Sequence, residues 1–294
     1  MNTQALPYIT VLGFLFGSTL VASRFSVGQF QPSTYIGLQL TIAGLAYILT
    51  YLLGRRRFNW PRDGRLWRRG ILLGVLGTAV PMTSIVTALQ YISSGLASIL
   101  ITTSPAITVI MAHFWLADER LNWRKGGGVL LALSGTVLLA ASGESGLANV
   151  DKADPRGYLL LLLAMVCGSG AAIFLRKYMR GYRPFDVATI RMVSAAIVVM
   201  PLSVLFVGFD LQPVTSSGYL ALAYSAAVGT FAGLLLAVYN VKRFGATAAV
   251  MTAYLVPIFA LLGGVLLLDE RITLVMLGGV TLILLGVFTI NRSS

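Results

Sequence analysis

Charged side chains are scarce in this sequence of 294 residues. They make up 11% of the chain, against 57% apolar residues, whereas soluble domains carry about 25% charged residues. This composition excludes a soluble globular domain and indicates a chain that lies in a lipid bilayer. The first apolar stretch has no basic residue before it and no small-residue cleavage site, so we interpret it as a helix and not as a signal peptide.

Cysteine and histidine each occur once. The single Cys167 excludes an internal disulfide and leaves the redox compartment undetermined. An enzyme acting inside the membrane needs a nucleophile with a base, paired aspartates or facing metal ligands. With one histidine and no carboxylate inside an apolar stretch, none of these sets is assembled. We therefore expect no enzymatic activity, no cofactor and no bound metal.

Long apolar stretches are what the chain does contain. A helix needs roughly 17–25 apolar residues to cross the hydrocarbon core, and the lack of alternating polarity argues against a membrane barrel. We expect an all-α protein with ten transmembrane helices. The spans are Leu6–Ser23, Tyr35–Leu53, Ile71–Tyr91, Leu96–Ala117, Gly126–Ser142, Tyr158–Leu175, Val187–Val207, Tyr219–Val241, Ala246–Leu268 and Ile272–Ile290.

The sequence also repeats itself at an offset of 151 residues. The triplet Asp-Glu-Arg at 118–120 recurs at 269–271, and nine of the eighteen positions from 118 to 135 are identical to their shifted partners. Gly17-Ser18 finds Gly168-Ser169 by the same shift. Pro105 and Pro257 differ by 152, which a slip of one residue in the fourth or ninth span explains.

Each copy contains five spans, and an odd number of crossings turns the second copy upside down. We interpret residues 1–142 as the first repeat, 143–156 as an external linker and 157–294 as the second, inverted repeat. The corners at 118–120 and 269–271 are then expected on opposite sides of the membrane. An inverted repeat in a protein with many spans is typical of secondary transporters.

The net charge of +12 is distributed unevenly between the loops. Seventeen lysines and arginines fall on the side that holds both termini, four on the other side, and Arg191 falls within a span. By the positive-inside rule both termini are expected in the cytoplasm, and a nucleic-acid partner is excluded. Trp60, Trp67 and Trp123 lie beside these arginines, where aromatic rings anchor at the lipid headgroups.

Polar side chains near the middle of the spans give a candidate substrate-binding cavity. Hydroxyl, thioether and aromatic groups together suit a flat, weakly polar solute, although each hydroxyl alone also suits a bond to its own helix backbone. The candidate residues are Ser18, Thr78, Met82, Thr102, Thr103, Ser169, Tyr224, Thr230, Thr252 and Tyr254.

Pro81, Pro105 and Pro257 lie near the middles of the third, fourth and ninth spans. Each lacks a backbone N–H, so we expect a kink at each, either static or used as a hinge between two conformations.

The Asp-Glu-Arg corners place four charged residues at helix ends: Glu119, Arg120, Glu270 and Arg271. A carboxylate there accepts backbone N–H groups or pairs with the following arginine. We expect structural capping ahead of gating.

Arg191 and His113 have no assigned role. A charge at the bilayer centre costs roughly 2.5–3.5 kcal/mol on insertion scales, so Arg191 is expected to snorkel or to pair with another helix, with binding of a substrate carboxylate as the alternative. His113 is expected to be interfacial or hydrogen-bonded, with a proton-linked role as the alternative. Because no carboxylate falls at mid-depth, we expect transport without proton coupling through an acid.

Two five-span repeats, each with a mid-span proline in the fourth helix, a Glu at the helix end and a glycine-rich fifth helix, resemble the EamA type of the drug/metabolite transporter superfamily. Within it the chain is most similar to the YddG-type exporters of aromatic amino acids and flat cationic drugs. The resemblance covers the whole chain. It implies a cavity walled by helices one, three, four, six, eight and nine, a small-molecule substrate, and a bacterial inner-membrane location.

The alternatives share this architecture or part of it. A multidrug carrier, or a carrier of nucleotide sugars or lipid precursors, has the same fold, although phosphate recognition calls for more buried basic residues than Arg191. A receptor or scaffold that does not transport is expected to have longer soluble loops. We expect a monomer whose partners are its substrate and membrane lipid.

Overall fold

Hydrocarbon offers no partner to backbone polar groups, so a chain of this composition forms spans whose hydrogen bonds are internal. The computed structural model describes residues 3–54, 60–116, 121–150, 152–244 and 246–292, and every regular element within them is helical. The described residues contain ten helical spans that are long and apolar enough to cross a membrane. The prediction of an all-helical protein with ten spans is confirmed.

The first repeat opens with a short 3-10 turn, and two of its spans are composite. Its elements are η1 (Thr3–Ala5), α1 (Leu6–Val27), α2 (Pro32–Leu53), α3 (Gly64–Gly74), η2 (Val75–Ala79), α4 (Val80–Ala88), α5 (Ser94–Ile101), α6 (Ser104–Trp115) and α7 (Trp123–Ser142). The third span is α3, η2 and α4 in series, and the fourth is α5 followed by α6.

The second repeat follows the same order, with one composite span. Its elements are α8 (Pro155–Tyr178), α9 (Pro184–Phe206), α10 (Ser216–Tyr224), η3 (Ser225–Ala232), α11 (Gly233–Phe244), α12 (Ala246–Leu268) and α13 (Leu274–Arg292). Ten crossings put both chain ends on one side of the bundle, the termini side. The loop between α7 and α8 lies on the opposite side, the linker side.

The third span begins earlier than its apolar run predicts. Helix α3 starts at Gly64, where the side chain of Asp63 caps it by accepting the Arg65 N–H at 2.7 Å. This backbone bond and the hydroxyl of Tyr182 hold the pKa of Asp63 below its usual value. Arg65, expected in a loop, therefore lies in the first turn, because a long arginine keeps its charge at the interface while its helix continues inward.

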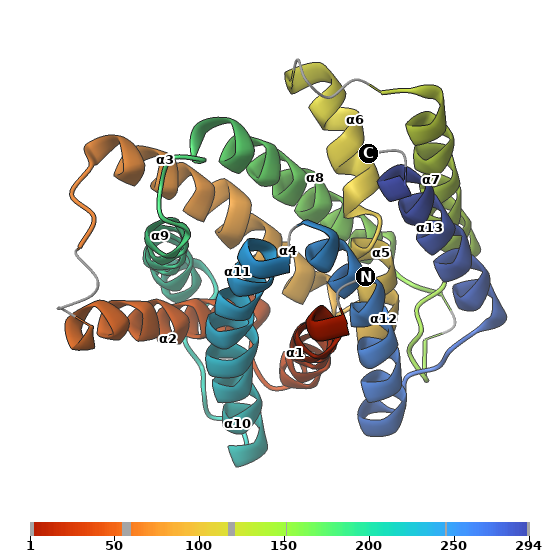
Figure 1. The fold of residues 1–294 in the computed structure, drawn as a ribbon. Coiled ribbons are helices and arrows are strands. Elements are labelled where there is room, and N and C mark those ends of the chain that lie inside the picture. The colour runs from red at the N-terminus through yellow and green to blue at the C-terminus, as the bar shows by residue number, and fades with distance from the viewer. Residues whose placement is uncertain (1–2, 55–59, 117–120, 151, 245, 293–294) are drawn as a thin grey trace.

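Equivalent spans of the two repeats pack against each other. Helix α2 contacts α9, the second span of each repeat, and α7 contacts α13, the fifth span of each. Figure 1 shows these pairs at opposite edges of the bundle. The first span of each repeat likewise contacts the fourth span of the other, α1 with α12 and α8 with α5 and α6. This exchange of partners is what a two-fold relation between inverted repeats produces.

The α7–α13 contact shows the two-fold relation at atomic detail. A Cβ added at Gly128 would lie 2.7 Å from the carbonyl oxygen of Gly286, and one added at Gly286 would lie 2.6 Å from the carbonyl oxygen of Gly128. Gly135 approaches the carbonyl of Gly279 in the same manner, at 2.8 Å. Small residues let two helix backbones come this close in a membrane, so the repeated glycines are the seam between the repeats.

Replacing Gly128 by leucine is expected to open this seam and lower thermal stability, because backbone atoms of α13 cannot move aside for a side chain. Overpacking of this kind costs about 1–3 kcal/mol. The matched control is Gly127→Leu, since a Cβ at Gly127 meets nothing within 4 Å. Thermal unfolding of both variants in detergent measures the difference, and equal losses would show that the seam is not tightly packed.

Candidate substrate cavity

A cavity of about 760 Å³ lies between the two repeats. This size falls within the 300–1,000 Å³ range of small-molecule sites. Its wall takes residues from spans of both repeats, including Phe16 on α1, Met82 on α4, Val109 on α6, Met192 on α9 and Val256 on α12. The wall is mainly apolar, with hydroxyl and amide groups between the apolar side chains.

None of the described residues that line this cavity carries a charge. Its polar members are serines, threonines and two amides, Gln39 on α2 and Asn291 in the last turn of α13. Asn291 places one end of the wall at the termini side. The cavity therefore accommodates a solute by shape and hydrogen bonds, without an opposite charge to neutralise it.

Of the ten residues proposed from the sequence, five line the cavity: Met82, Thr102, Ser169, Thr230 and Thr252. Pro105, proposed as a hinge, also lies in the wall. The expected helices one, three, four, six, eight and nine all contribute, and the second, seventh and tenth spans contribute as well.

The other five candidates are not among the described lining residues, and their polar atoms bond to neighbouring helices. Ser18 Oγ lies 2.7 Å from the Tyr224 hydroxyl, and Thr103 Oγ1 lies 2.9 Å from Thr136 Oγ1. The hydroxyl of Tyr254 accepts a bond of 3.2 Å from Asn291. Thr78, the fifth, receives a bond from Arg191.

Sequence reasoning passed over several wall residues, among them Gln39, Ser98, Ser104, Thr108 and Asn291. A glutamine inside an apolar span was the detectable signal, since burial of an amide requires partners. The family resemblance implies no wall residues from the second span, so it gives no reason to single out Gln39.

The three prolines have different surroundings. Thr102 and Thr103 separate α5 from α6, with Pro105 at the second position of α6. Proline gives no N–H to the carbonyl four residues earlier, and the Ser104 hydroxyl instead donates to the Ile101 oxygen at 2.6 Å. Pro257, by contrast, lies inside an unbroken α12. Pro105 and Pro257 are equivalent in the two repeats, but only Pro105 adjoins a break between helices.

Pro81 follows the π-helical segment η2. A residue with a backbone N–H at this position would donate to the carbonyl of Gly77, four residues earlier, but proline has none. Arg191 Nη2 donates to that carbonyl at 3.0 Å, and Arg191 Nε donates to Thr78 Oγ1 at 3.2 Å. The half-buried arginine is thus paired with the third span. A π-segment inside a helix frequently marks a functional position.

The second repeat carries the equivalent arrangement. Its π-segment η3 occupies the same place in the eighth span, and Gln39 Nε2 donates to Thr230 Oγ1 at 2.8 Å and to the Ser225 oxygen at 3.4 Å. Positions 39 and 191, like 78 and 230, are 152 residues apart. Gln39 and Arg191 are therefore counterparts, each reaching from one repeat to the π-segment of the other.

Glu270 joins the two repeats at the linker side. Its buried carboxylate accepts the backbone N–H groups of Ser94 at 2.7 Å and Gly95 at 3.1 Å, and the Ser94 hydroxyl at 2.9 Å. A carboxylate at a helix N-terminus is favourable, so Glu270 caps α5. The side chain of Arg271 is exposed. Glu119 and Arg120 lie outside the described residues.

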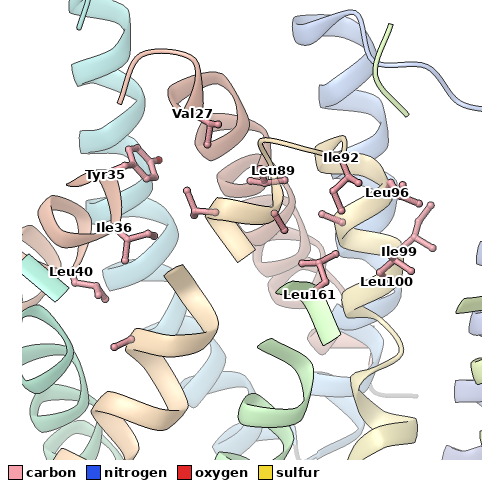
Figure 2. Close-up of a cluster of buried hydrophobic side chains, with 14 of the residues drawn as sticks. Val27, Tyr35, Ile36, Leu40, Leu89, Ile92, Leu96, Ile99, Leu100 and Leu161 are labelled. Carbon is pink, nitrogen blue, oxygen red and sulfur yellow. The ribbon is translucent and has the colours of Figure 1, made fainter. Parts of the chain in front are cut away.

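Apolar packing accompanies this cap. Val27, Leu89, Ile92 and Leu96 belong to one buried cluster, and Figure 2 shows them gathered where α1, the α4–α5 turn and α5 meet. These positions all lie at linker-side ends of spans. The cavity wall extends to Asn291 at the termini side. His113, exposed near the end of α6, accepts the Leu121 N–H at 3.1 Å and lies away from the cavity wall.

Two repeated helical units around a solute-sized cavity define a membrane carrier. Sequence comparison matches the EamA-like transporter family over residues 4–141 and again over 155–292. The chain therefore belongs to the EamA-like transporter family, within the drug/metabolite transporter superfamily.

Relatives cover nearly the whole chain. An uncharacterized transporter of Archaeoglobus fulgidus is 27% identical over 94% of this chain and 95% of its own length. The uncharacterized transporter YoaV of Bacillus subtilis is 24% identical over 93% and 92%, and the uncharacterized inner membrane transporter YedA of Escherichia coli is 26% identical over 89% and 83%. A protein of known crystal structure, 22% identical, covers 100% of this chain and 99% of its own with a TM-score of 0.67, which shows the fold alone.

Replacing Arg191 by leucine is expected to cost about 1–3 kcal/mol of unfolding free energy, because it removes the donor to the Gly77 carbonyl. In a Pro81→Ala background the new N–H supplies that carbonyl, so the same replacement is expected to cost less. Arg180→Leu, at an exposed loop position, is the control and is expected within about 0.5 kcal/mol of the parent. Strictly additive losses at 81 and 191 would refute the pairing.

Proposed function

We propose that this protein is a monomeric secondary transporter that exports small organic solutes, aromatic amino acids and related flat compounds, by alternating access. The observation that carries the proposal is the cavity between the two inverted repeats. Because the repeats have opposite orientations, interchanging their conformations converts a cavity open toward one side into one open toward the other.

The chemistry of the wall supports a flat, largely apolar solute. Phe16, Met82 and Met192 bring an aromatic face and two polarizable thioethers to the cavity, and such groups pack well against rings. Phosphate-bearing solutes are a poor fit, since none of the described lining residues is basic. This favours amino-acid or drug-like cargo over nucleotide sugars and lipid precursors.

The distribution of carboxylates supports transport down the solute gradient. Glu270 is engaged at a helix end, and Asp186, in the first turn of α9, accepts the hydroxyl of Tyr51. No described carboxylate lines the cavity. Proton exchange through an acid needs a carboxylate that both the solute and the water can reach, so coupling of this kind is not part of the proposal.

The charge asymmetry supports a bacterial inner-membrane location with both termini in the cytoplasm. The termini side carries the basic clusters, including Arg65, Arg68 and Arg69 on α3. In this orientation the cavity wall extends to Asn291 at the cytoplasmic end, which supports loading of an exported solute from that side.

Filling the cavity is expected to stop transport without unfolding the protein. Gly168 lines the cavity, and a Cβ there meets nothing within 4 Å, so Gly168→Phe places a ring in the space meant for the solute. In proteoliposomes, parent protein is expected to exchange radiolabelled tryptophan or phenylalanine saturably, and this variant to lose at least about tenfold in rate, the equivalent of 1.4 kcal/mol.

Gly278→Phe is the control, because its site also has nothing within 4 Å but lies outside the cavity wall. This variant is expected to exchange the labelled amino acid at the rate of the parent protein.

Collapse of an imposed pH gradient is expected to leave the exchange rate of the parent protein unchanged. Absence of saturable exchange by the folded parent would overturn the proposed cargo, and dependence on the pH gradient would overturn the uncoupled mechanism.

A further inference from the structure

Five of the nine described hydroxyl residues in the cavity wall point their hydrogens into their own helices. Each donates to a backbone carbonyl of the same span at 2.5–2.9 Å. A carbonyl only accepts, so the direction of these bonds is fixed by chemistry. The residues are Thr19, Ser98, Thr102, Ser104 and Thr230.

Thr108 and Ser169 behave in the same way as a pair. Their hydroxyl oxygens lie 2.9 Å apart, and both lie within hydrogen-bond distance of the Ser104 carbonyl, at 2.9 and 3.3 Å. Their hydrogens therefore remain within the wall. A hydroxyl has one hydrogen and two lone pairs, so groups bonded in this manner offer a solute only lone pairs.

Gln39 adds a carbonyl oxygen to this set. Its Nε2 donates to Ser225 O, which only accepts, and this contact fixes which end of the amide carries the oxygen. The side chain is 1% exposed and lines the cavity, yet Oε1 has no hydrogen-bond partner. An unpaired buried carbonyl is unfavourable. Less than 1 Å² of Oε1 is accessible, so a donor reaches it from the cavity only when neighbouring side chains move aside.

We propose that the cavity recognises its solute through N–H donors, such as a primary ammonium group, and that it does not recognise a carboxylate. This inference rests on the proposed transport of aromatic solutes and names the head group that the site selects. An ammonium has three N–H donors, enough for Gln39 Oε1 and two hydroxyl oxygens. A carboxylate brings only lone pairs, and it meets these oxygens with no cation among the described lining residues to neutralise it.

Three indole compounds with different head groups test the rule: tryptamine, tryptophan and indole-3-propionate. Competition against labelled tryptophan in proteoliposomes is expected to show tryptamine at least as potent as tryptophan, and indole-3-propionate at least about tenfold weaker. A thermal-shift series with cyclohexylamine and cyclohexanecarboxylate, which have no aromatic ring, separates the head-group rule from the aromatic cargo.

The outcomes are distinguishable. Failure of every indole to compete, with the amine still stabilising the protein more than the carboxylate, removes the aromatic cargo and keeps the donor rule. Carboxylates that match or exceed the amines overturn the donor rule whatever is transported. If neither the amines nor the carboxylates change the melting temperature of the protein, the donor rule is overturned as well.

Single-atom variants test the wall directly. Thr102→Val removes one acceptor oxygen from the cavity, and Gln39→Met removes the unpaired carbonyl. Each is expected to weaken tryptamine about three- to tenfold, the usual range for one hydrogen bond, and to leave indole-3-propionate unchanged. Thr281→Val is the matched control, because Thr281 makes the same bond to its own helix, at 2.7 Å to Leu277 O, but its side chain is exposed on α13. An equal loss for amine and acid at position 102 would contradict the proposal.

Discussion

Every backbone carbonyl and N–H in a bilayer needs a partner from the protein, and this requirement shapes the centre of the molecule. The helices around the cavity are interrupted by prolines and π-segments, which displace backbone bonds. Side chains take up the displaced groups: Arg191 bonds the Gly77 carbonyl, Ser104 the Ile101 carbonyl and Gln39 the Ser225 carbonyl. The displaced backbone groups therefore keep hydrogen-bond partners, even in helices that are able to deform.

The same requirement determines what the cavity offers to a solute. Hydroxyls that donate to carbonyls of their own helices use their hydrogens there, so these groups are left with lone pairs. The proposed preference for N–H donors follows from these bonds, and no charged residue has to be buried to produce it. A charged partner at this depth would cost several kcal/mol unless it were paired.

The two repeats are equivalent in fold but not in chemistry. Gln39 and Arg191 occupy equivalent places and reach across to equivalent π-segments. An amide keeps an acceptor after its N–H groups are used, whereas a guanidinium has only donors. Gln39 lines the cavity and Arg191 is not among the described lining residues. Equivalent positions thus hold a cavity-lining amide in one repeat and a guanidinium outside the described lining in the other.

The number of spans and the repeat follow from the sequence, because length, apolarity and identity at a fixed offset are visible there. The rotation of each helix about its axis is not visible. Both faces of a membrane helix are apolar, so the sequence places Thr102 and Thr103 at the same depth and gives no sign that only Thr102 lines the cavity.

The ends of the helices cannot be predicted from the apolar runs either, because a helix can continue through arginines such as Arg65. The role of Gln39 needed the structure too, because only the bond to Ser225 shows which of its amide atoms remains unpaired.

The opposite orientation of the two repeats is the claim on which cavity and exchange both depend. Positions 62 and 213 are exposed in the corresponding loops before the third and eighth spans. Single cysteines there, in a Cys167→Ala background, are to be labelled in intact cells with a thiol reagent that does not cross the membrane. The account predicts labelling at 213 and protection at 62 until the cells are opened. Labelling of both positions, or of neither, from the outside would contradict it.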